Sequence, residues 1–289
     1  KLSGFDAKVK STVLPGSGLS SSAAFEVLIG RILNGLFADN AVSVIEIAQI
    51  GQYAENVYFS KPSGLMDQMA SSVGGLVFID FAEPKRPTVE KVDYDFAHCG
   101  YTLCIIDSGA DHADLTAEYA AIPAEMKNVA AYFGKAVLRD VDEETFLKAI
   151  PEVRKVTGDR AVVRAIHFYN DSRRAGEIYE AIKADDFDRF LQLIIEGGHS
   201  SFEFNQNAYS IKNPQEQGVP LALAISQKVL NGRGAWRLQG GGFAGTIQAF
   251  VPLALLETYK NAIDAVFGAG SCHVLSVRNY GAVMVTPDM

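Results

Sequence analysis

The spacing of apolar and polar residues predicts that the chain begins with three helices. Apolar residues recur every three or four positions over 23–37, which indicates an amphipathic helix. Ser43, followed three residues later by Glu46, is typical of a capping box, and it predicts a second helix that ends near Phe59. A short third helix is expected over 65–73, after a chain break rich in proline and glycine.

The remainder of the chain alternates short apolar runs with long helical patterns. Apolar runs bounded by turn residues predict buried strands at 75–81, 101–107, 235–239, 245–251, 272–278 and 281–285. Helical spacing predicts helices at 116–133, 143–150, 160–183, 186–201, 221–231 and 253–267. This order is mixed α+β rather than a regular βαβ alternation, and we place a domain boundary near residue 112.

Composition favours a soluble, globular protein of one large or two ordinary domains. The chain has 289 residues, of which 48% are hydrophobic and 21% charged, with a formal net charge of -8. An acidic surface repels nucleic acid and anionic membranes, so we expect neither as a partner. The three cysteines, in a chain without a CxxC pair, indicate reduced thiols and a cytoplasmic location. The sequence does not fix an oligomeric state, and a monomer is our default expectation.

A glycine- and serine-rich loop precedes the first predicted helix. It consists of Pro15, Gly16, Ser17, Gly18, Leu19, Ser20, Ser21 and Ser22. Glycines let the backbone N–H groups approach phosphate oxygens, and the helix that follows adds the positive end of its dipole. Serine hydroxyls can in addition ligate a Mg²⁺ ion held by phosphate. The alternative is a flexible connector with a serine helix cap, because the loop is neither a Walker A sequence nor GxGxxG.

Two carboxylates in the first part of the chain are candidates for chemistry. Glu55 is in line with Val44 and Ala48 on an apolar helical stripe, where a carboxylate should be paired, bound to metal or at the edge of the stripe. Asp67 falls in the first turn of the predicted short helix. Each also has an ordinary explanation, since Glu55 could pair with Lys61 and Asp67 could simply favour the helix dipole.

A second glycine cluster lies between the predicted strands near residue 240. Gly240, Gly241, Gly242 and Gly245 surround Phe243 and Ala244. A hairpin turn is the simplest explanation. The number of glycines exceeds the need of a turn, however, and suggests close approach by another backbone or a ligand.

Taken in order, these motifs resemble those of the GHMP kinases, and within that family the galactokinases. The segment Gly18-Leu19-Ser20-Ser21-Ser22-Ala23-Ala24 is similar to the second family motif. Ala54-Glu55, and twelve residues later Gly64-Leu65-Met66-Asp67-Gln68, are similar to a galactokinase pair of motifs with the same spacing. The glycines at 240–245 resemble the third motif, with Ala244 in place of one family glycine.

The resemblance implies a two-domain GHMP fold and a role for each motif. It implies an incomplete ribosomal-protein S5-like domain over 1–112 and a ferredoxin-like domain over 113–289. ATP would bind the first glycine loop, Mg²⁺ would be ligated by Ser22 and Glu55, and Asp67 would be the catalytic base. Asp67 and Tyr119 would contact the sugar, since Glu118-Tyr119 resembles a galactokinase Glu-Tyr pair, although the basic residues that usually follow are absent. The implied reaction converts ATP and galactose into ADP and galactose 1-phosphate.

Several alternatives stay open at this point. The sugar could be N-acetylgalactosamine, galacturonate or arabinose, because the phosphate machinery would be the same. A galactose sensor without activity is a further alternative, disfavoured by the intact Ser22-Ala23 pair that such sensors lack. The first family motif, a Gly-Glu-His-Thr-Asp-containing stretch that supplies most sugar contacts, is not found in the chain, so we expect the chain alone to be incomplete as an enzyme. Asp111, His112 and Asp114 lack metal-ligand spacing and are interpreted as a solvated loop, and His167, His199 and Trp236 as structural.

Overall fold

The computed structural model describes residues 3–13, 19–60, 63–109, 115–243 and 245–285. Over these residues the chain forms two compact units, Lys1–Asp95 with Val277–Met289, and Phe96–Ser276. Within the described ranges, no helix combines the length and the apolar character needed to cross a membrane.

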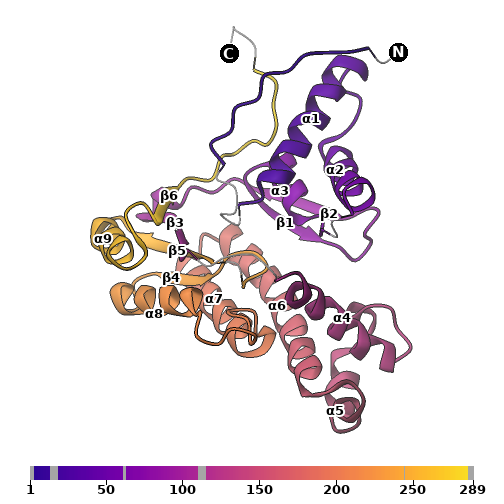
Figure 1. The fold of residues 1–289 in the computed structure, drawn as a ribbon, viewed down its shortest axis with the longest axis vertical. Helices are drawn as coiled ribbons and strands as arrows, with labels where there is room; N and C mark the ends of the chain where they lie inside the picture. The colour runs from indigo at the N-terminus through magenta and orange to yellow at the C-terminus, as the bar shows by residue number, and fades with distance from the viewer. Residues whose placement is uncertain (1–2, 14–18, 61–62, 110–114, 244, 286–289) are drawn as a thin grey trace. The chain divides into compact units, whose positions relative to one another are not determined.

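The first unit contains three helices and one β-hairpin (Figure 1). The helices are α1 (Ser21–Phe37), α2 (Val44–Tyr58) and α3 (Met66–Val73). Strands β1 (Leu76–Asp80) and β2 (Thr88–Val92) pair antiparallel. The core between the α2–α3 pair and the hairpin centres on Ala48, Leu65 and Met69.

Helices α1 and α2 form an αα-hairpin whose turn is fixed by side chains. Asn34, buried near the end of α1, donates from Nδ2 to the Val42 carbonyl and accepts from the Val42 N–H at its Oδ1. The Ser43 hydroxyl accepts from the Glu46 N–H, and the Glu46 carboxylate accepts from the Ser43 N–H. The predicted capping box is therefore confirmed, and it starts α2 at the predicted residue.

The face that α1 buries differs from the apolar stripe seen in the sequence. Phe25 and Leu36 are exposed among the described residues, whereas Ala23 and Val27 are buried. The small residues face α2 because the two helices approach closely at Gly30, where an added Cβ would lie 2.9 Å from Ile47 Cγ2. Close packing of two helices thus selects small side chains at their contact.

The segment after residue 276 returns to the first unit without forming the strand predicted at 281–285. The Gly75 N–H donates to the Arg278 carbonyl over 2.8 Å. The backbone of Gly281 lies so close to α3 that a Cβ there would be 2.1 Å from the Ser72 carbonyl oxygen. This contact between two backbones holds residues 277–285 in an irregular conformation instead of a β-strand. We call this segment the strap.

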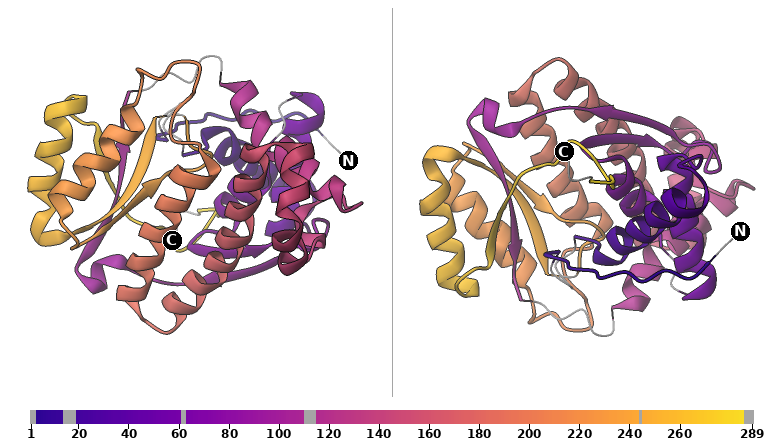
Figure 2. Two further views of the ribbon diagram at one scale, coloured as in Figure 1. Left: turned by 90° about the horizontal axis from the view of Figure 1, so that it is seen from below. Right: turned by 90° about the horizontal axis from the view of Figure 1, so that it is seen from above.

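The second unit is built on a four-stranded antiparallel sheet in the order β4-β5-β3-β6. The strands are β3 (Tyr101–Asp107), β4 (Ala235–Leu238), β5 (Thr246–Pro252) and β6 (Cys272–Leu275). One face packs against α8 (Gly218–Leu230) and α9 (Leu256–Phe267), the orange and yellow helices of Figure 2, around a core that includes Trp236, Ile247 and Tyr259. Phe250 points to the opposite face, where its ring meets Phe96 and Phe190.

A helical layer completes the second unit and has its own core. Its helices are α4 (Thr116–Tyr132), α5 (Glu143–Thr157), α6 (Asp159–Lys183) and α7 (Phe187–Ser200), of which α4, α5 and α6 enclose buried Val129, Phe146 and Ala165. Short turns are η1 (Phe96–Cys99), η2 (Leu138–Asp140) and η4 (Leu253–Leu255), and a π-helical turn, η3 (Ser201–Asn205), follows α7. Helix α5 was predicted to end at residue 150, but it continues through Pro151 because Val153 in the next turn is fully buried.

The compact units divide the chain at a different place from the predicted domain boundary. Residue 112 itself lies outside the described residues. Strand β3, which we grouped with the first domain, pairs with β5 and β6 and so belongs to the second unit. Its partners lie more than a hundred residues further along the chain, and local patterns carry no information about such pairing. The antiparallel sheet with separate helical layers confirms the α+β class.

Candidate active site

The first turn of α1 presents backbone donors beside serine hydroxyls. Pro15, Gly16, Ser17 and Gly18 lie outside the described residues, so only the last part of the predicted phosphate loop can be placed. Ser20 adopts a left-handed conformation (φ 55°) and makes no side-chain capping bond, and no acidic residue occupies the first turn. The positive end of the helix dipole is thus not neutralised by the first turn, which suits an anion.

The packing of α1 against α2 has a register that, extended by one turn, pairs Ser22 with Glu55. Gly30 on α1 contacts Ile47 on α2, and Glu26 on α1 contacts Gly51 on α2. From the first contact to the second, the position moves back four residues on α1 and forward four residues on α2. The helices therefore run antiparallel, and each step of one turn keeps the same pairing. One further turn in this register would bring Ser22 and Glu55 to the same level of the hairpin, which α1 and α2 form in Figure 1.

The chemistry of this pair fits a divalent cation shared with a phosphate. Ser22 is exposed on α1, whereas Glu55 is 4% exposed on α2. A hydroxyl and a carboxylate are hard oxygen ligands of the kind that Mg²⁺ uses, with phosphate and water completing its shell. In the described part of the chain, no three His, Cys, Asp or Glu side chains form a metal cluster by themselves. The expected site would thus depend on the nucleotide for its remaining ligands.

Helix α3 carries the predicted base and a polar residue whose role was not predicted from the sequence. Asp67 is exposed in the first turn of α3. Its neighbour Gln68 is 1% exposed and donates from Nε2 to Glu26 Oε2 and to Glu55 Oε2, each over 3.0 Å. Glu26 was missed, and Gln68 was noted only as the last residue of its motif, because the link between them joins residues 42 positions apart. The one indication in the sequence that Glu26 lies near the site is its position one helical turn after Ser22.

The glycine cluster of the second unit forms the turn between β4 and β5, and close neighbours require glycine at Gly241 and Gly242. Gly242 has a φ of 76°, and a Cβ there would lie 2.2 Å from the Asn207 carbonyl oxygen. The Phe243 N–H donates to that same carbonyl over 2.6 Å, and Asn207 Nδ2 donates to the Gly241 carbonyl over 3.0 Å. Ala244 lies outside the described residues. Close backbone approach, one of the two explanations considered for the cluster, is therefore observed, and its partner is Asn207.

Tyr119 also contacts this glycine turn. Its hydroxyl donates to the Gly242 carbonyl over 2.6 Å, and its ring meets the Phe243 ring edge-on at 5.3 Å. Burial raises the pKa of Tyr119 to about 12, so the hydroxyl stays protonated and can keep donating. The structure thus gives Tyr119 a role in holding the glycine turn, and its contact with a sugar stays a prediction.

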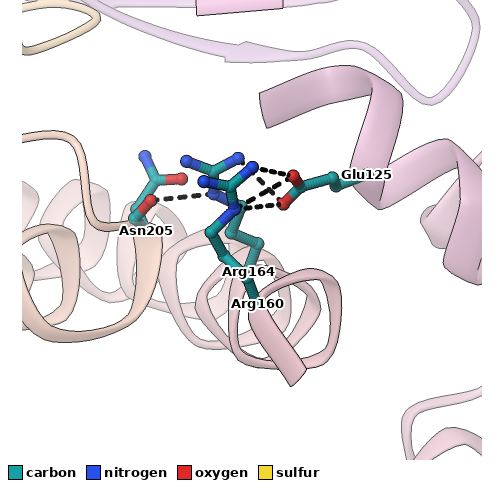
Figure 3. A network of polar contacts seen from close by, with 4 residues as sticks. All are labelled: Glu125, Arg160, Arg164 and Asn205. Atoms are coloured by element: carbon teal, nitrogen blue, oxygen red, sulfur yellow. Dashed lines mark hydrogen bonds and ion pairs between the residues drawn. The ribbon is translucent and has the colours of Figure 1, made fainter. Parts of the chain in front are cut away.

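A partly buried ionic network secures the chain segment that leads to Asn207 (Figure 3). Arg164 is 1% exposed, donates from Nε to the Asn205 carbonyl over 3.0 Å and pairs through Nη1 with Glu125 over 2.9 Å. Arg160, one turn earlier on α6, binds the same Glu125 carboxylate. Burial lowers the pKa of Arg164 from its usual value, but the nearby carboxylate keeps the guanidinium paired.

The remaining candidates from the sequence have structural surroundings. His167 is buried on α6, its Nδ1 lies 2.9 Å from the Ser200 hydroxyl, and its pKa is lowered by burial. Trp236 packs in the sheet core, as predicted. Asp111, His112 and Asp114 lie outside the described residues. The phosphate loop belongs to the first compact unit and the glycine turn to the second.

Comparison with known proteins agrees with these motifs. Residues 1–75 match the model of the GHMP kinases N terminal domain. The galactokinase of Actinobacillus pleuropneumoniae is 33% identical over 263 residues, which cover 90% of this chain and 65% of that protein. The galactokinase of Streptomyces coelicolor is 29% identical, with 93% and 66% covered. The structure of Lactococcus lactis galactokinase complexed with galactose superposes with a TM-score of 0.75 at 21% identity, covering 94% of this chain and 69% of that one.

The chain has the GHMP kinase fold, and its residues 1–75 match the N-terminal domain of that family. The curated proteins named above to which it is similar are galactokinases, in agreement with the resemblance of its motifs. It spans about 65% of the length of the curated relatives that it matches.

Proposed function

We propose that the protein containing this chain is an ATP-dependent sugar kinase that phosphorylates galactose at its anomeric hydroxyl. The observation that carries the proposal is the antiparallel register of α1 against α2, seen in the contacts of Gly30 with Ile47 and of Glu26 with Gly51. Extended by one turn, this register pairs Ser22 with Glu55, and Asp67 is exposed on the adjoining α3. The similarity to galactokinases supports galactose as the substrate.

Each group of the proposed site has a separate role in phosphoryl transfer. The backbone N–H groups at the start of α1 bind phosphate oxygens, and Ser22 and Glu55 hold Mg²⁺. When bound, Mg²⁺ neutralises the charge on the transferring phosphate and orients it. Asp67 accepts the proton of the sugar hydroxyl while that oxygen bonds to the γ-phosphorus, and the bond from the γ-phosphorus to the bridging oxygen breaks to release ADP.

The supply of ATP and the presence of three free thiols favour the cytoplasm as the compartment. A sugar and ATP are then the expected partners, and a monomer suffices for the proposed site.

The test of the substrate is a panel of sugars offered to the complete protein, with release of ADP as the measurement. We expect turnover with galactose. We also expect the product to carry its phosphate on the anomeric oxygen, as galactose 1-phosphate. No turnover of galactose, with turnover of N-acetylgalactosamine, galacturonate or arabinose, would reassign the substrate and leave the phosphate site unchanged. Binding of galactose and ATP without release of ADP would point instead to a sensor.

The test of the residue roles uses two substitutions in the complete protein. Asp67→Asn should lower kcat by about 10²–10⁴-fold, the usual contribution of a general base, with little change in affinity for ATP. Ser22→Ala should raise the Mg²⁺ concentration needed for half-maximal turnover. Asp39→Asn, a change of the same kind at an exposed turn residue, serves as the control. Near-normal turnover of Asp67→Asn would show that Asp67 is not the base.

A further inference from the structure

The amide of Gln68 joins the three helices of the first unit at a single point. From α3 it donates to a carboxylate on α1 and to a carboxylate on α2, Glu26 and Glu55, with both distances 3.0 Å. The side chain is 1% exposed, and Glu55 is 4% exposed, so water screens these bonds weakly. A buried junction of this kind fixes the position of every group in it.

The chemistry of the junction leaves one orientation for the amide. An amide nitrogen carries two hydrogens, and here each of two carboxylates receives one. Turning the amide over would place its carbonyl oxygen against two acceptors, which repel it. The Glu26 and Glu55 side chains thus orient Gln68, and Gln68 in return holds both side chains in place.

The junction adjoins the expected metal ligands. Glu26 lies one helical turn after Ser22, and Gly51, which contacts Glu26, lies one turn before Glu55. Gln68 also follows Asp67 directly, so one turn of α3 carries both the exposed carboxylate and the amide. The Oε1 of Gln68 is buried without a hydrogen-bond partner among the described residues, which leaves it an acceptor for a donor from outside them.

We propose that Gln68 is a positioning residue for the metal-nucleotide site, acting by holding the Glu55 carboxylate with Glu26 as the second anchor. The inference rests on the proposed role of Glu55 as a metal ligand. A ligating carboxylate whose one oxygen is fixed by a hydrogen bond presents its other oxygen in a defined direction. Gln68 would thus raise the affinity for the metal without contacting it.

The test measures metal binding apart from catalysis, in the complete protein. Mn²⁺ serves as a probe for Mg²⁺, and its binding in the presence of ADP is followed by electron paramagnetic resonance. Gln68→Met keeps the length of the side chain and removes both donors. We expect it to weaken Mn²⁺ binding by about 10–100-fold, as is usual for a lost partner of a metal ligand, and to change metal-free ADP affinity by less than about twofold.

Three further variants separate the possible outcomes. Gln49→Met, an equivalent change on α2 where the amide donates to the Lys85 carbonyl, should leave Mn²⁺ binding unchanged. Glu55→Gln should weaken binding, and Gln68→Met added to it should cause no further loss, because Gln68 acts through Glu55. Thermal melts accompany each variant, and Gln68→Asn, which withdraws the amide by one methylene, replaces Gln68→Met in the same assays if the latter does not fold.

The failure of this inference can be told apart from the failure of the proposed function. Normal Mn²⁺ binding by Gln68→Met, with weakened binding by Glu55→Gln, would overturn the role of Gln68 alone. Normal binding by both variants would overturn the metal role of Glu55, and with it the basis of the inference.

Discussion

Glu55 and Asp67 lie in contrasting surroundings that suit the roles proposed for them. Glu55 is 4% exposed and receives a hydrogen bond from Gln68, whereas Asp67 is exposed at the start of α3. A metal ligand gains from fixed geometry and weak screening, while a base must reach the substrate. Both residues are identifiable in the sequence. The surroundings of Glu55 are not, because Gln68 reaches it from a separate helix.

At Gly242, the cost of a steric clash can be measured apart from the cost of a left-handed backbone conformation. Gly242→Ala places a Cβ 2.2 Å from the Asn207 carbonyl oxygen, at a φ of 76°. Gly232→Ala is the matched control, because its φ is 77° and no atom lies within 4 Å of the added Cβ. We expect Gly232→Ala to cost about 1–2 kcal/mol of stability for the left-handed conformation.

Gly242→Ala should cost at least about 2 kcal/mol more than its control, since the backbone of Asn207 must move and two hydrogen bonds to the glycine turn are strained. Urea unfolding of both variants measures the difference. Equal losses would mean that the turn yields to the added carbon and that Asn207 does not constrain it.

His167 should make the stability of the protein depend on pH. Its imidazole is buried, and burial lowers its pKa below the ordinary value of about 6.5. Asp171 opposes this shift, whereas Arg174 and Arg237 add to it, and Ser200 accepts or donates at Nδ1. The unfolded state therefore binds a proton at a higher pH than the folded state does.

The sign follows from this difference. Neutral His167 contributes fully to the free energy of unfolding above about pH 6.5. This contribution is lost as the pH falls toward the lowered pKa of His167, at up to about 1.4 kcal/mol per pH unit. His167→Gln should flatten the dependence of the free energy of unfolding between pH 7 and pH 5. His199→Gln, which alters a side chain that is 61% exposed, should leave the dependence as in the unmodified protein. An unchanged slope in His167→Gln would refute the argument.

At the scale of elements, helices were predicted best and irregular pieces worst. Helices α1, α2, α3 and α4 begin and end within about two residues of the predicted bounds, because amphipathic spacing and the capping box are local signals. Strand β2 was missed, since its pattern of exposure does not alternate cleanly and it pairs only with β1. The π-helical turn at Ser201–Asn205 has no local sequence signal, because it is held by Arg164 from a different helix.

Arg164 ties three elements together, and its removal should be correspondingly costly. It links α6 to Glu125 on α4 and to the carbonyl that ends the π-helical turn η3. Arg164→Met would leave the Asn205 carbonyl unpaired and remove one of the two cations at Glu125, so we expect a loss of about 3–5 kcal/mol. Arg173→Met, on the same helix, alters a side chain that is 53% exposed, and should cost less than about 1 kcal/mol.

Chemical denaturation of these two variants checks the prediction. Losses within about 1 kcal/mol of each other would show that Arg160 alone satisfies Glu125 and that the network of Figure 3 adds little to stability.

At the scale of the molecule, the two compact units have unequal cores. In the first unit the buried apolar side chains among the described residues are Ala23, Val27, Ile47, Ala48, Leu65 and Met69. The second unit holds two larger clusters, one between the sheet and α8 and α9, the other among α4, α5 and α6. Because apolar burial is the main favourable term in folding, the second unit should be the more stable.

This imbalance predicts how the units behave when separated. The fragment 96–276 contains both large clusters and all four strands of its sheet, so it should fold alone, with a helical circular dichroism spectrum and a cooperative thermal transition. The fragment 1–95 loses the strap that contacts Gly75 and α3, and it has few buried apolar residues, so it should lack a cooperative transition. Restoring residues 277–289 through a short linker after residue 95 should recover part of its structure if the strap contributes as inferred. A cooperative transition in fragment 1–95 alone would show that the α1–α2–α3 core suffices, and the absence of one in 96–276 would show that the second unit depends on the first.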